Sequence, residues 1–428
     1  MDLEKITREF QNCDCGQVHT CPIEVVKIGS GVLDSLMKLC SDYKHILLVS
    51  DENTYKACGE RVYGLLRHKV DENLILHTDG KVVIPNEQSI ALIESKLTDK
   101  TDLIVGVGSG VINDLCKYVS FFHNLPYFIV ATATSMDGYV SVGAAMILDG
   151  MKVTFTTRPP KAVIADTAIL KDAPLKMLQA GYGDIVGKYS CLNDWQLSAM
   201  LNDEHFCQKI FDYMLACTNT VKGLAEGLLQ RDEETLGILM EALVTVGVLM
   251  CFVGSSRPAS GSEHHLSHFF EITGILNDKP YFDHGIDVLY SAYYTQKLRE
   301  ELLEIDSLTP VPGLSKDAYE REIQRIYHKL SPEVMGLQNK LGWYLQDRYS
   351  LYAQRWDDIK LLLSQTPSSV QMEQYITAIG LNLREFEDMY GMDKLLDAIY
   401  FAKDLKDRYS VLWLYFSLNY TRSIYDAY

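Results

Sequence analysis

A chain of 428 residues is too long for one ordinary hydrophobic core, so two domains are expected. A hydrophobic share of 47% and a charged share of 23% are typical of a folded globular protein, which excludes a disordered or fibrous chain. The net charge of −17 argues against nucleic-acid and anionic-membrane partners, because their phosphate groups attract basic surfaces.

The N-terminus and one long apolar stretch bear on the cellular location. Residues 1–12 are charged and lack the apolar core of a signal peptide, so a cytoplasmic protein is expected. The stretch Leu236–Gly254 is apolar apart from Glu241, but its length is marginal for a membrane span, and no aromatic or basic anchors flank it. We therefore expect a buried core helix there.

The ten cysteines are expected to be reduced, because they are not dense for this length and no secretory signal precedes them. Cys13, Cys15 and Cys21 lie close to His19 in sequence, which allows a zinc site. The C-x-C-x5-C spacing, however, lacks the two paired knuckles of the usual structural zinc site. The favoured interpretation is a strand or turn with buried thiols.

The first third of the chain alternates between two hydrophobic periods. In chain order the pattern predicts a strand at 44–51, a helix at 53–69 behind the capping residue Asn53, a strand at 73–78, a helix at 86–98, a strand at 102–110, a helix at 111–123 and a strand at 125–134. The strands are continuously apolar and separated by single helices, which indicates a parallel sheet buried on both faces. This order is typical of nucleotide-binding domains but does not by itself indicate a chemistry.

Beyond these elements the pattern changes twice. The pair Asp149-Gly150 favours a tight turn, so an antiparallel hairpin is expected about it. From about Asp172 onward strand signals nearly vanish, and amphipathic helical stretches continue to the C-terminus. The expected fold class is therefore α/β, with an N-terminal parallel-sheet nucleotide-binding domain (residues 1–170) followed by an all-helical C-terminal domain (residues 171–428).

A glycine-rich loop, from Gly106 to Gly110, joins the strand at 102–110 to the next helix. Its small residues let backbone N–H groups approach a phosphate, and the N-terminus of the helix adds positive potential. The spacing is not the Rossmann G-x-G-x-x-G, because Asn113 stands in the place of the third glycine, and no Walker motif is present. Tight packing explains such a loop about as often as a bound phosphate does.

Two other strand ends carry polar residues. Asp51 follows the first strand, where an acidic side chain can bind a ribose diol, although it can equally cap the following helix. The segment Thr132–Ser141 places five small polar or acidic side chains just past a buried strand. Because ligands of α/β sheets bind at the carboxyl ends of the strands, the three strand ends together indicate a ligand crevice.

Later in the chain, one acidic residue and three histidines suggest a metal site. Asp184 lies within an otherwise apolar helical stretch, where an isolated buried carboxylate is costly unless it is paired or binds a metal. His264 and His268 are one helical turn apart and therefore share a face, and His284 follows them closely. One carboxylate and two imidazoles would leave open positions on a divalent metal. The alternative is that these histidines cap helices or face the solvent and bind no metal.

The motifs GVGSGVIND, ATATSMDGYVS, GYGDIVGKYS, SGSEHHLSHFFE and DHG together carry a family resemblance. The chain resembles the bacterial branch of the sn-glycerol-1-phosphate dehydrogenases. That family belongs to the superfamily of dehydroquinate synthases, glycerol dehydrogenases and iron-containing alcohol dehydrogenases. The resemblance spans roughly Cys13 to Val288, and the role of the region after about Glu300 stays open.

The resemblance implies a set of site residues. It implies one divalent metal, zinc or nickel, held by Asp184, His264 and His284. It implies a site for NAD(H), with NADP(H) as a second cofactor, formed by Asp51, Gly108, Ser109, Gly110, Asp114, Thr132, Ser135 and Ser141. It implies that the substrate-binding and catalytic residues are Asp137, Asp184 and His268. Ser109 replaces a glycine that the family usually has, a departure that the loop can tolerate.

The activity implied is the reversible, metal-dependent reduction of dihydroxyacetone phosphate to sn-glycerol 1-phosphate by NAD(P)H, in a cytoplasmic homo-oligomer. His268 or a metal-bound water would supply the proton. Arg257 and Lys188 are candidates for binding the substrate phosphate, because both lie near the metal residues in sequence.

Three other functions remain open at this point. One is a glycerol or polyol dehydrogenase with no phosphate requirement. The second is a dehydroquinate-synthase-like cyclase, a family that has Glu at the Asp184 position and more basic residues around its substrate. The third is a catalytically silent nucleotide-binding protein, which the presence of all three ligand types disfavours.

Overall fold

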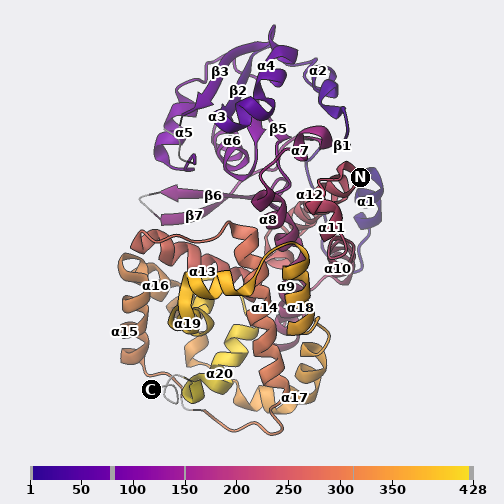
Figure 1. Cartoon of the computed structure of the whole chain (residues 1–428). Helices are drawn as coiled ribbons and strands as arrows, with labels where there is room; N and C mark the ends of the chain where they lie inside the picture. The colour runs from indigo at the N-terminus through magenta and orange to yellow at the C-terminus, as the bar shows by residue number, and fades with distance from the viewer. Residues whose placement is uncertain (1–2, 78–81, 149–150, 312, 424–428) are drawn as a thin grey trace. The chain divides into compact units, whose positions relative to one another are not determined.

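The computed structural model describes residues 3–77, 82–148, 151–311 and 313–423 (Figure 1). The chain divides into two compact units. Unit 1 comprises Met1–Ile185 and Cys217–Ser256, and unit 2 comprises Val186–Ala216 and Arg257–Tyr428. The division expected at residues 170/171 coincides with the end of the strand-containing region. The chain leaves unit 1 further on, because the helices up to residue 185 and those from 217 to 256 pack with the sheet-containing part.

Unit 1 contains the predicted parallel sheet. Its six strands are β1 (Val25–Gly29), β2 (Ile46–Asp51), β3 (Val70–Leu76), β4 (Leu103–Gly108), β5 (Tyr127–Ala131) and β8 (Ala162–Asp166). They lie in the order β1-β8-β5-β4-β2-β3, and every neighbouring pair is parallel. The prediction of an α/β fold with a buried parallel sheet is therefore confirmed, and strands β2, β3, β4 and β5 correspond to the four that the pattern predicts.

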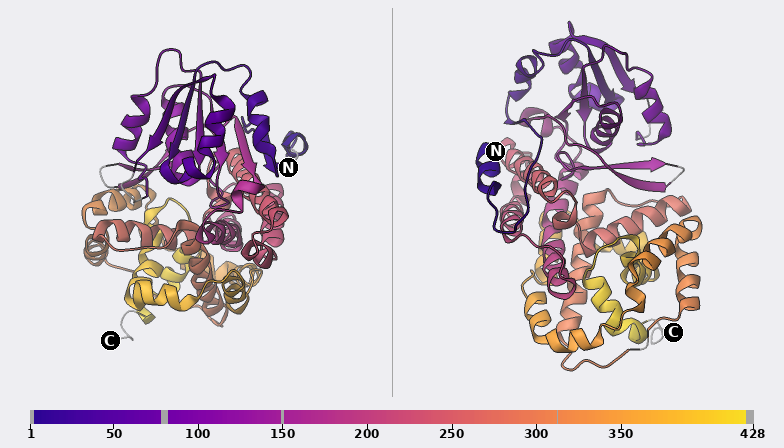
Figure 2. Two further views of the ribbon diagram at one scale, coloured as in Figure 1. Left: turned by 45° about the horizontal axis from the view of Figure 1, so that its top comes forward. Right: turned by 180° about the vertical axis from the view of Figure 1, so that it is seen from behind.

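Helices of unit 1 cover both faces of this sheet (Figure 2), and the remaining helices of the unit pack against one another. They are α1 (Leu3–Phe10), η1 (Val32–Ser35), α2 (Leu36–Leu39), α3 (Glu52–Thr54), η2 (Tyr55–Gly59), α4 (Glu60–Leu66), α5 (Glu87–Glu94), α6 (Gly110–Phe122), α7 (Thr167–Leu170), α8 (Leu175–Val186), α11 (Ala225–Leu229) and α12 (Glu233–Val253). The division between the units falls within α10 (Gln208–Val221), whose residues up to Ala216 belong to unit 2. Alternate strand residues such as Leu48, Val105 and Val130 form one core with α2 and α4. The strand residues that alternate with these face α6. Because both faces of the sheet are covered, each strand is a continuous run of apolar residues.

The helix predicted at 53–69 has two differences from the expectation. It is divided by the π-helical turn η2, and its capping residue is Asp51 rather than Asn53. The Asp51 carboxylate accepts hydrogen bonds from the backbone N–H groups of Asn53 and Thr54, both at 2.8 Å. A carboxylate is at least as good a cap as an amide, so the helix begins as soon as the strand ends.

The predicted hairpin is also present. β6 (Gly143–Leu148) pairs antiparallel with β7 (Met151–Thr156), although the turn residues Asp149 and Gly150 themselves lie outside the described residues. The long apolar stretch forms α12, which within the described residues is the one helix long and apolar enough to cross a membrane. Because 78% of its most apolar window is buried in the structure, it has the burial of a core helix, as predicted.

Unit 2 is helical, and its described part contains no strand. Its elements are α9 (Lys188–Asn202), η3 (Arg257–Ala259), α13 (Ser262–Asn277), α14 (His284–Leu303), α15 (Lys316–Tyr327), η4 (His328–Leu330), α16 (Ser331–Leu341), η5 (Trp343–Leu345), α17 (Tyr349–Leu363), α18 (Ser369–Ala378), α19 (Leu383–Phe401), η6 (Ala402–Leu405) and α20 (Val411–Ser423). The helical C-terminal region that the sequence predicts is therefore confirmed.

A buried ion pair joins four helices of unit 2. Arg299 on α14 and Asp194 on α9 are both fully buried, with 2.8 Å between Nη2 and Oδ1. The Asp194 carboxylate also accepts the backbone N–H groups of Ser262 (2.6 Å), at the start of α13, and Val411 (2.9 Å), at the start of α20. Burial raises the pKa of Asp194, while the Arg299 charge opposes that rise. The pair thus fixes the start of the helix that carries His264.

Candidate active site and metal centre

The carboxyl ends of β2, β4 and β5 are neighbours in the sheet of unit 1. From β2 the chain continues to β3 at one edge and then returns to β4 on the other side of β2. Such a reversal of strand order is where open α/β sheets form their ligand crevices. The structure therefore brings Asp51, the Gly106–Gly110 loop and the segment Thr132–Ser141 to one side of the sheet.

The glycines of the loop have a packing requirement of their own. A Cβ at Gly108 would lie 2.6 Å from the Ile112 side chain, and one at Gly106 would lie 2.9 Å from Cys116 Sγ. A side chain at either position would therefore separate α6 from β4. The loop still leads into the N-terminus of a 13-residue helix, whose first N–H groups lack intrahelical partners. Packing and phosphate binding are thus compatible at this loop.

A buried lysine that sequence analysis missed organises the segment Thr132–Ser141. Lys117 on α6 is fully buried and donates to the carbonyl oxygens of Gly138 and Gly143, both at 2.8 Å, and to Ser141 Oγ at 3.3 Å. Burial lowers the pKa of Lys117, and the charge of Asp114 opposes this. Asp114 itself accepts the backbone N–H of Ala145 at 3.1 Å. Lys117 therefore positions the loop that carries Ser135, Asp137 and Ser141.

Asp184 lies on α8, is 1% exposed, and accepts the backbone N–H of Asp137 through Oδ2 at 2.9 Å. The two predicted residues therefore meet within unit 1. The close approach of α8 to this loop depends on Gly181, because a Cβ there would lie 1.8 Å from the carbonyl oxygen of Thr134. The helix thus presents the Asp184 carboxylate at the loop that carries Asp137.

Three histidines cluster in unit 2. His264 and His268 lie one turn apart on α13 with ring centroids at 6.2 Å, which confirms their predicted common face. His284 is the first residue of α14, and its ring centroid lies 5.1 Å from that of His264 and 5.2 Å from that of His268. The connection between α13 and α14 is short, so three imidazoles separated by up to twenty residues in sequence lie close together.

Hydrogen bonds orient two of these rings. His264 Nδ1 lies 2.7 Å from Glu263 Oε1, and His284 Nδ1 lies 3.3 Å from Ser267 Oγ. Burial works against the ionisation of Glu263, but the hydrogen bond and charge of His264 together with backbone hydrogen bonds outweigh it and hold the pKa of Glu263 below its usual value. An imidazole held at Nδ1 by a carboxylate or hydroxyl presents Nε2 to a metal, as metal-binding histidines usually do. The donor set therefore fits a divalent metal.

Sequence analysis also missed Glu271. Its carboxylate, one ring nitrogen of His268 and one of His284 lie within 4.8 Å of one another. The separation of His268 Nδ1 from Glu271 Oε2 is 3.7 Å. Glu271 follows His268 by three residues on the same helix, a spacing that places two side chains side by side and could have indicated the pair.

Arg257, which the sequence nominates for binding the substrate phosphate, makes contacts within unit 2. Its side chain is buried, with Nε 2.7 Å from Glu204 Oε1 and Nη2 donating to the carbonyl oxygens of Asp194 (3.1 Å) and Tyr409 (2.9 Å). These contacts join η3 to α9 and to the start of α20. Lys188, the other nominated cation, is fully buried at the start of α9.

Two cations that the sequence did not point to lie near the start of α13. Arg408 donates to the carbonyl oxygen of Ser260 at 3.3 Å, four residues before His264. Burial and then the charges of Arg408, Lys406 and Arg257 hold the pKa of His265 well below its usual value, so these cations surround one buried, neutral imidazole. Burial, followed by repulsion from Arg257, lowers the pKa of Arg408 to about 10.

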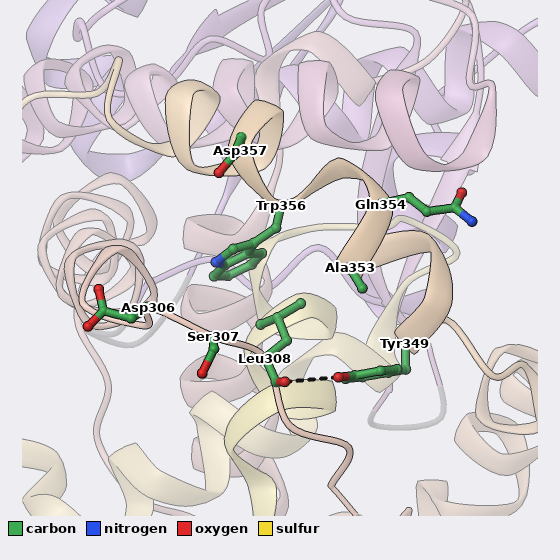
Figure 3. Close-up of a pocket in the computed structure, with 8 residues that line it drawn as sticks. All are labelled: Asp306, Ser307, Leu308, Tyr349, Ala353, Gln354, Trp356 and Asp357. Carbon is green, nitrogen blue, oxygen red and sulfur yellow. Dashed lines mark hydrogen bonds between the residues drawn. The ribbon is translucent and has the colours of Figure 1, made fainter.

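A separate pocket in unit 2 contains none of the predicted site residues (Figure 3). Its volume is about 290 Å³, and its lining residues are Asp306, Ser307, Leu308, Tyr349, Ala353, Gln354, Trp356 and Asp357. The Tyr349 hydroxyl donates to the carbonyl oxygen of Leu308 at 2.9 Å, and Trp356 Nε1 donates to that of Ile305 at 3.2 Å. These polar groups hold the α14–α15 connection against α17, which is a structural role.

Comparison with known proteins identifies the family. Residues 27–174 match the family model described as iron-containing alcohol dehydrogenase. The chain is 34% identical over 311 residues to glycerol-1-phosphate dehydrogenase [NAD(P)+] of Halalkalibacterium halodurans, a match covering 70% of this chain and 78% of the relative. The chain belongs to the glycerol-1-phosphate dehydrogenase family. Membership confirms the resemblance seen in the motifs and makes the protein an oxidoreductase.

Two further relatives extend this result. The glycerol-1-phosphate dehydrogenase [NAD(P)+] of Geobacillus thermodenitrificans is 28% identical over 383 residues, covering 88% of each chain. An alignment of that length continues past Glu300, so most of the C-terminal helical region is also part of the family pattern. The crystal structure of glycerol dehydrogenase from Schizosaccharomyces pombe has a TM-score of 0.54 at 16% identity, covering 89% of this chain and 94% of that one, which shows the shared fold.

Proposed function

We propose that this protein reduces dihydroxyacetone phosphate to sn-glycerol 1-phosphate with NADH or NADPH, reversibly and in the cytoplasm. The observation that carries the proposal is the pair of imidazoles, His264 and His284, held at Nδ1 by Glu263 and Ser267 in a chain of the glycerol-1-phosphate dehydrogenase family. The names of the curated relatives state NAD(P)+ as their cofactor. The proposal carries that cofactor over to the crevice of unit 1.

The proposed metal ligands are Asp184, His264 and His284, with zinc or nickel as the ion. The carboxylate oxygen and two imidazole nitrogens form a set that either ion accepts and that leaves positions for a substrate. A bound divalent ion supplies the Lewis acidity that polarises a carbonyl group. Asp137 contributes by fixing Asp184 through its backbone N–H.

The proposed cofactor site lies at the carboxyl ends of β2, β4 and β5. The N-terminus of α6, with Gly108, Ser109 and Gly110, faces the pyrophosphate, because its N–H groups and helix dipole favour an anion. The remaining proposed contacts are Asp51, Asp114, Thr132, Ser135 and Ser141. Lys117 is added as a positioning residue, since it holds the backbone of the loop on which Ser141 lies.

For proton transfer we propose His268. It lies on the same face of α13 as His264, with Nδ1 3.7 Å from Glu271 Oε2, and an imidazole there could act as the acid for the developing alkoxide. Asp137 and Asp184 are proposed as the substrate's other neighbours. In this arrangement the chain orients the carbonyl, and His268 delivers the proton to the oxygen.

Binding of the substrate phosphate is proposed for Arg408 and Lys406. Arg408 lies against Ser260, at the beginning of the segment that leads into His264. Two backbone N–H groups at the start of α13 already have partners, since Gly261 donates to Glu263 and Ser262 donates to Asp194. Side-chain cations are therefore proposed as the main partners of the dianion. Its arrival would offset the repulsion between Arg408 and Arg257.

The test compares dihydroxyacetone phosphate with dihydroxyacetone. We expect the phosphorylated substrate to have the far higher kcat/KM and the product to be the sn-1 isomer. Replacing Arg408 with Met is expected to lower kcat/KM for dihydroxyacetone phosphate by roughly ten- to a hundredfold, the effect of losing a charge-assisted contact worth about 1.5–3 kcal/mol. Turnover of dihydroxyacetone should change much less. Steady-state assays of NADH consumption measure both.

The control for this test is Arg257→Met. Because Arg257 holds elements of unit 2 together, this change should lower stability and affect both substrates alike. If Lys188→Met lowers kcat/KM for the phosphorylated substrate alone and Arg408→Met does not, Lys188 is the residue that binds the phosphate. Equal turnover of dihydroxyacetone and its phosphate by the unmodified enzyme would instead favour a polyol dehydrogenase.

Cofactor preference gives a second test, at Asp51. A carboxylate at this strand end would bind the ribose hydroxyls of NADH and repel the additional phosphate of NADPH. We expect kcat/KM to be higher with NADH than with NADPH. Asp51→Ser should reduce the ratio of these two values by about tenfold, because one charged contact is lost. Serine keeps a cap for the following helix, whereas Asp51→Ala removes cap and charge together. Equal kcat/KM for both cofactors in the unmodified enzyme would contradict the assignment.

A further inference from the structure

The segment between α1 and β1 is a long loop inside a compact unit. Residues 11–24 contain neither helix nor strand, although they connect an N-terminal helix to the edge of the sheet. Loops of this length without internal structure are uncommon in compact domains and need contacts that hold them. Three side chains of the loop come together: Cys13, Cys15 and His19.

The three side chains offer donor atoms at the spacing of metal ligands. Cys13 Sγ, Cys15 Sγ and a ring nitrogen of His19 lie within 4.8 Å of one another, and Cys15 Sγ is 3.1 Å from His19 Nε2. A turn brings the thiols together, with the backbone N–H of Gly16 donating to the carbonyl oxygen of Cys13 at 3.3 Å. Gly16 has φ +79°, a left-handed conformation that glycine adopts without strain.

The imidazole of His19 is oriented from its other side. Nδ1 lies 3.1 Å from the carbonyl oxygen of Phe252, near the end of α12, so Nδ1 carries the proton and Nε2 is the acceptor that faces Cys15. The ring is 4% exposed and packs against the rings of Phe10 (centroids at 5.4 Å) and Phe252 (5.7 Å), which also contact each other. A carbonyl that fixes the tautomer in this way is the usual support of a metal-binding histidine.

We propose that Cys13, Cys15 and His19 bind a structural zinc ion that fastens the N-terminal loop to the end of α12. Two thiolates and one imidazole are the donors that zinc prefers, and such sites are tetrahedral. The fourth position belongs to a further thiolate of the chain or to water. Zinc binding displaces a proton from each thiol, and no oxidant or reductant takes part.

The third cysteine of the segment is engaged elsewhere. Cys21 is hydrogen-bonded to Cys251, a contact that together with burial raises the pKa of Cys21. Cys251 in turn lies 3.6 Å from the carbonyl oxygen of Thr20 through its Sγ. Cys21 is therefore the matched control, a thiol of the same loop that does not belong to the zinc site.

This site is independent of the proposed active site, whose donors include no sulfur. In full-length protein purified without a metal-binding tag, we expect two metal equivalents per chain by mass spectrometry of the metals. Cys15→Ser and His19→Ala should each lose one equivalent, and Cys21→Ser should lose none. His264→Ala should lose the other equivalent and keep the zinc of the loop, so failure of either assignment is recognised separately.

A measurement on the unmodified protein avoids dependence on the folding of variants. The X-ray absorption spectrum of zinc bound to the chain should show sulfur neighbours at about 2.3 Å, because the loop holds the one cluster of metal donors with sulfur among the described residues. Cobalt-loaded protein should show a thiolate-to-cobalt charge-transfer band that is unchanged in His264→Ala and absent in Cys15→Ser.

Several outcomes would overturn the proposal. One is a chain whose single metal equivalent disappears in His264→Ala; another is a zinc spectrum with nitrogen and oxygen neighbours alone. Formation of a disulfide between Cys13 and Cys15 in freshly purified, metal-loaded protein would do the same, because oxidised sulfurs do not bind zinc. The proposed zinc ion stabilises the fold and takes no part in the reaction. Cys15→Ser should therefore lower the melting temperature while kcat stays unchanged.

Discussion

Replacing His264 with alanine should abolish turnover of dihydroxyacetone phosphate and remove the metal of the active site. The imidazole is buried and held at Nδ1 by Glu263, so Nε2 is the atom that would serve the proposed ion. Loss of an outer residue that orients a metal ligand typically lowers metal affinity or activity by 10–100-fold. Loss of the ligand itself should lower activity further, by roughly a thousandfold or beyond. Metal analysis and steady-state kinetics on the same preparation measure both effects.

His268→Ala is the matched control, since it removes the same group from the same face of α13. We expect this variant to keep its metal and to lose turnover, with a changed pH profile, because His268 is proposed to transfer a proton. The opposite pattern, metal lost in His268→Ala and kept in His264→Ala, would assign the ion to His268, Glu271 and His284, whose donor atoms also lie within 4.8 Å of one another.

The parts of this protein that the sequence predicts well are those set by local patterns. Strands β2, β4 and β5 are continuous apolar runs, because each is covered on both faces, and their helical connections read at a period of 3.6 residues. The common face of His264 and His268 follows from helix geometry alone. These features depend on residues that are close in sequence, so the spacing of residue types along the chain is enough to predict them.

What the sequence could not show depends on contacts between distant residues. Lys117 looks like an ordinary helix residue, and its role appears only when α6 is placed beside the loop containing Gly138, twenty-one residues later. Arg408 lies 148 residues from Ser260, and the nominated Arg257 is used by Glu204 and Tyr409 instead. Proximity in sequence therefore does not reveal the partners of a buried cation, and the choice of cation for the substrate phosphate stays a proposal.

The division into units shows the same limit. The strand pattern ends at Asp166, which suggests a boundary shortly afterwards, but α12 returns to unit 1 and packs against β1. An apolar helix gives no sign in its own sequence of which core it joins. The C-terminal region gains a role from the structure as well, since Tyr409 and Arg408 contact the segment that leads into α13 and Val411 contacts Asp194 on α9.

Arg299→Met is expected to destabilise unit 2 more than any surface change. The guanidinium of Arg299 donates to Asp194, Asn193, Ser190 and a backbone carbonyl oxygen of its own helix, and its side chain is fully buried. Methionine fills part of the volume but leaves the Asp194 carboxylate without its charged partner. Removing one member of a buried ion pair costs about 3–5 kcal/mol, a large share of the stability of an ordinary domain.

The readout for this prediction is specific to unit 2, because all four tryptophans, Trp195, Trp343, Trp356 and Trp413, belong to it. Urea unfolding followed by tryptophan fluorescence therefore reports on that unit. The control is Arg325→Met on α15, where the exposed ion pairs with Glu322 and Asp397 should be worth less than about 1 kcal/mol. If both variants unfold at the same urea concentration, the Arg299–Asp194 pair does not hold the four helices together. If Arg299→Met alone unfolds early, metal binding through His264 should weaken with it, since Asp194 also fixes the start of α13.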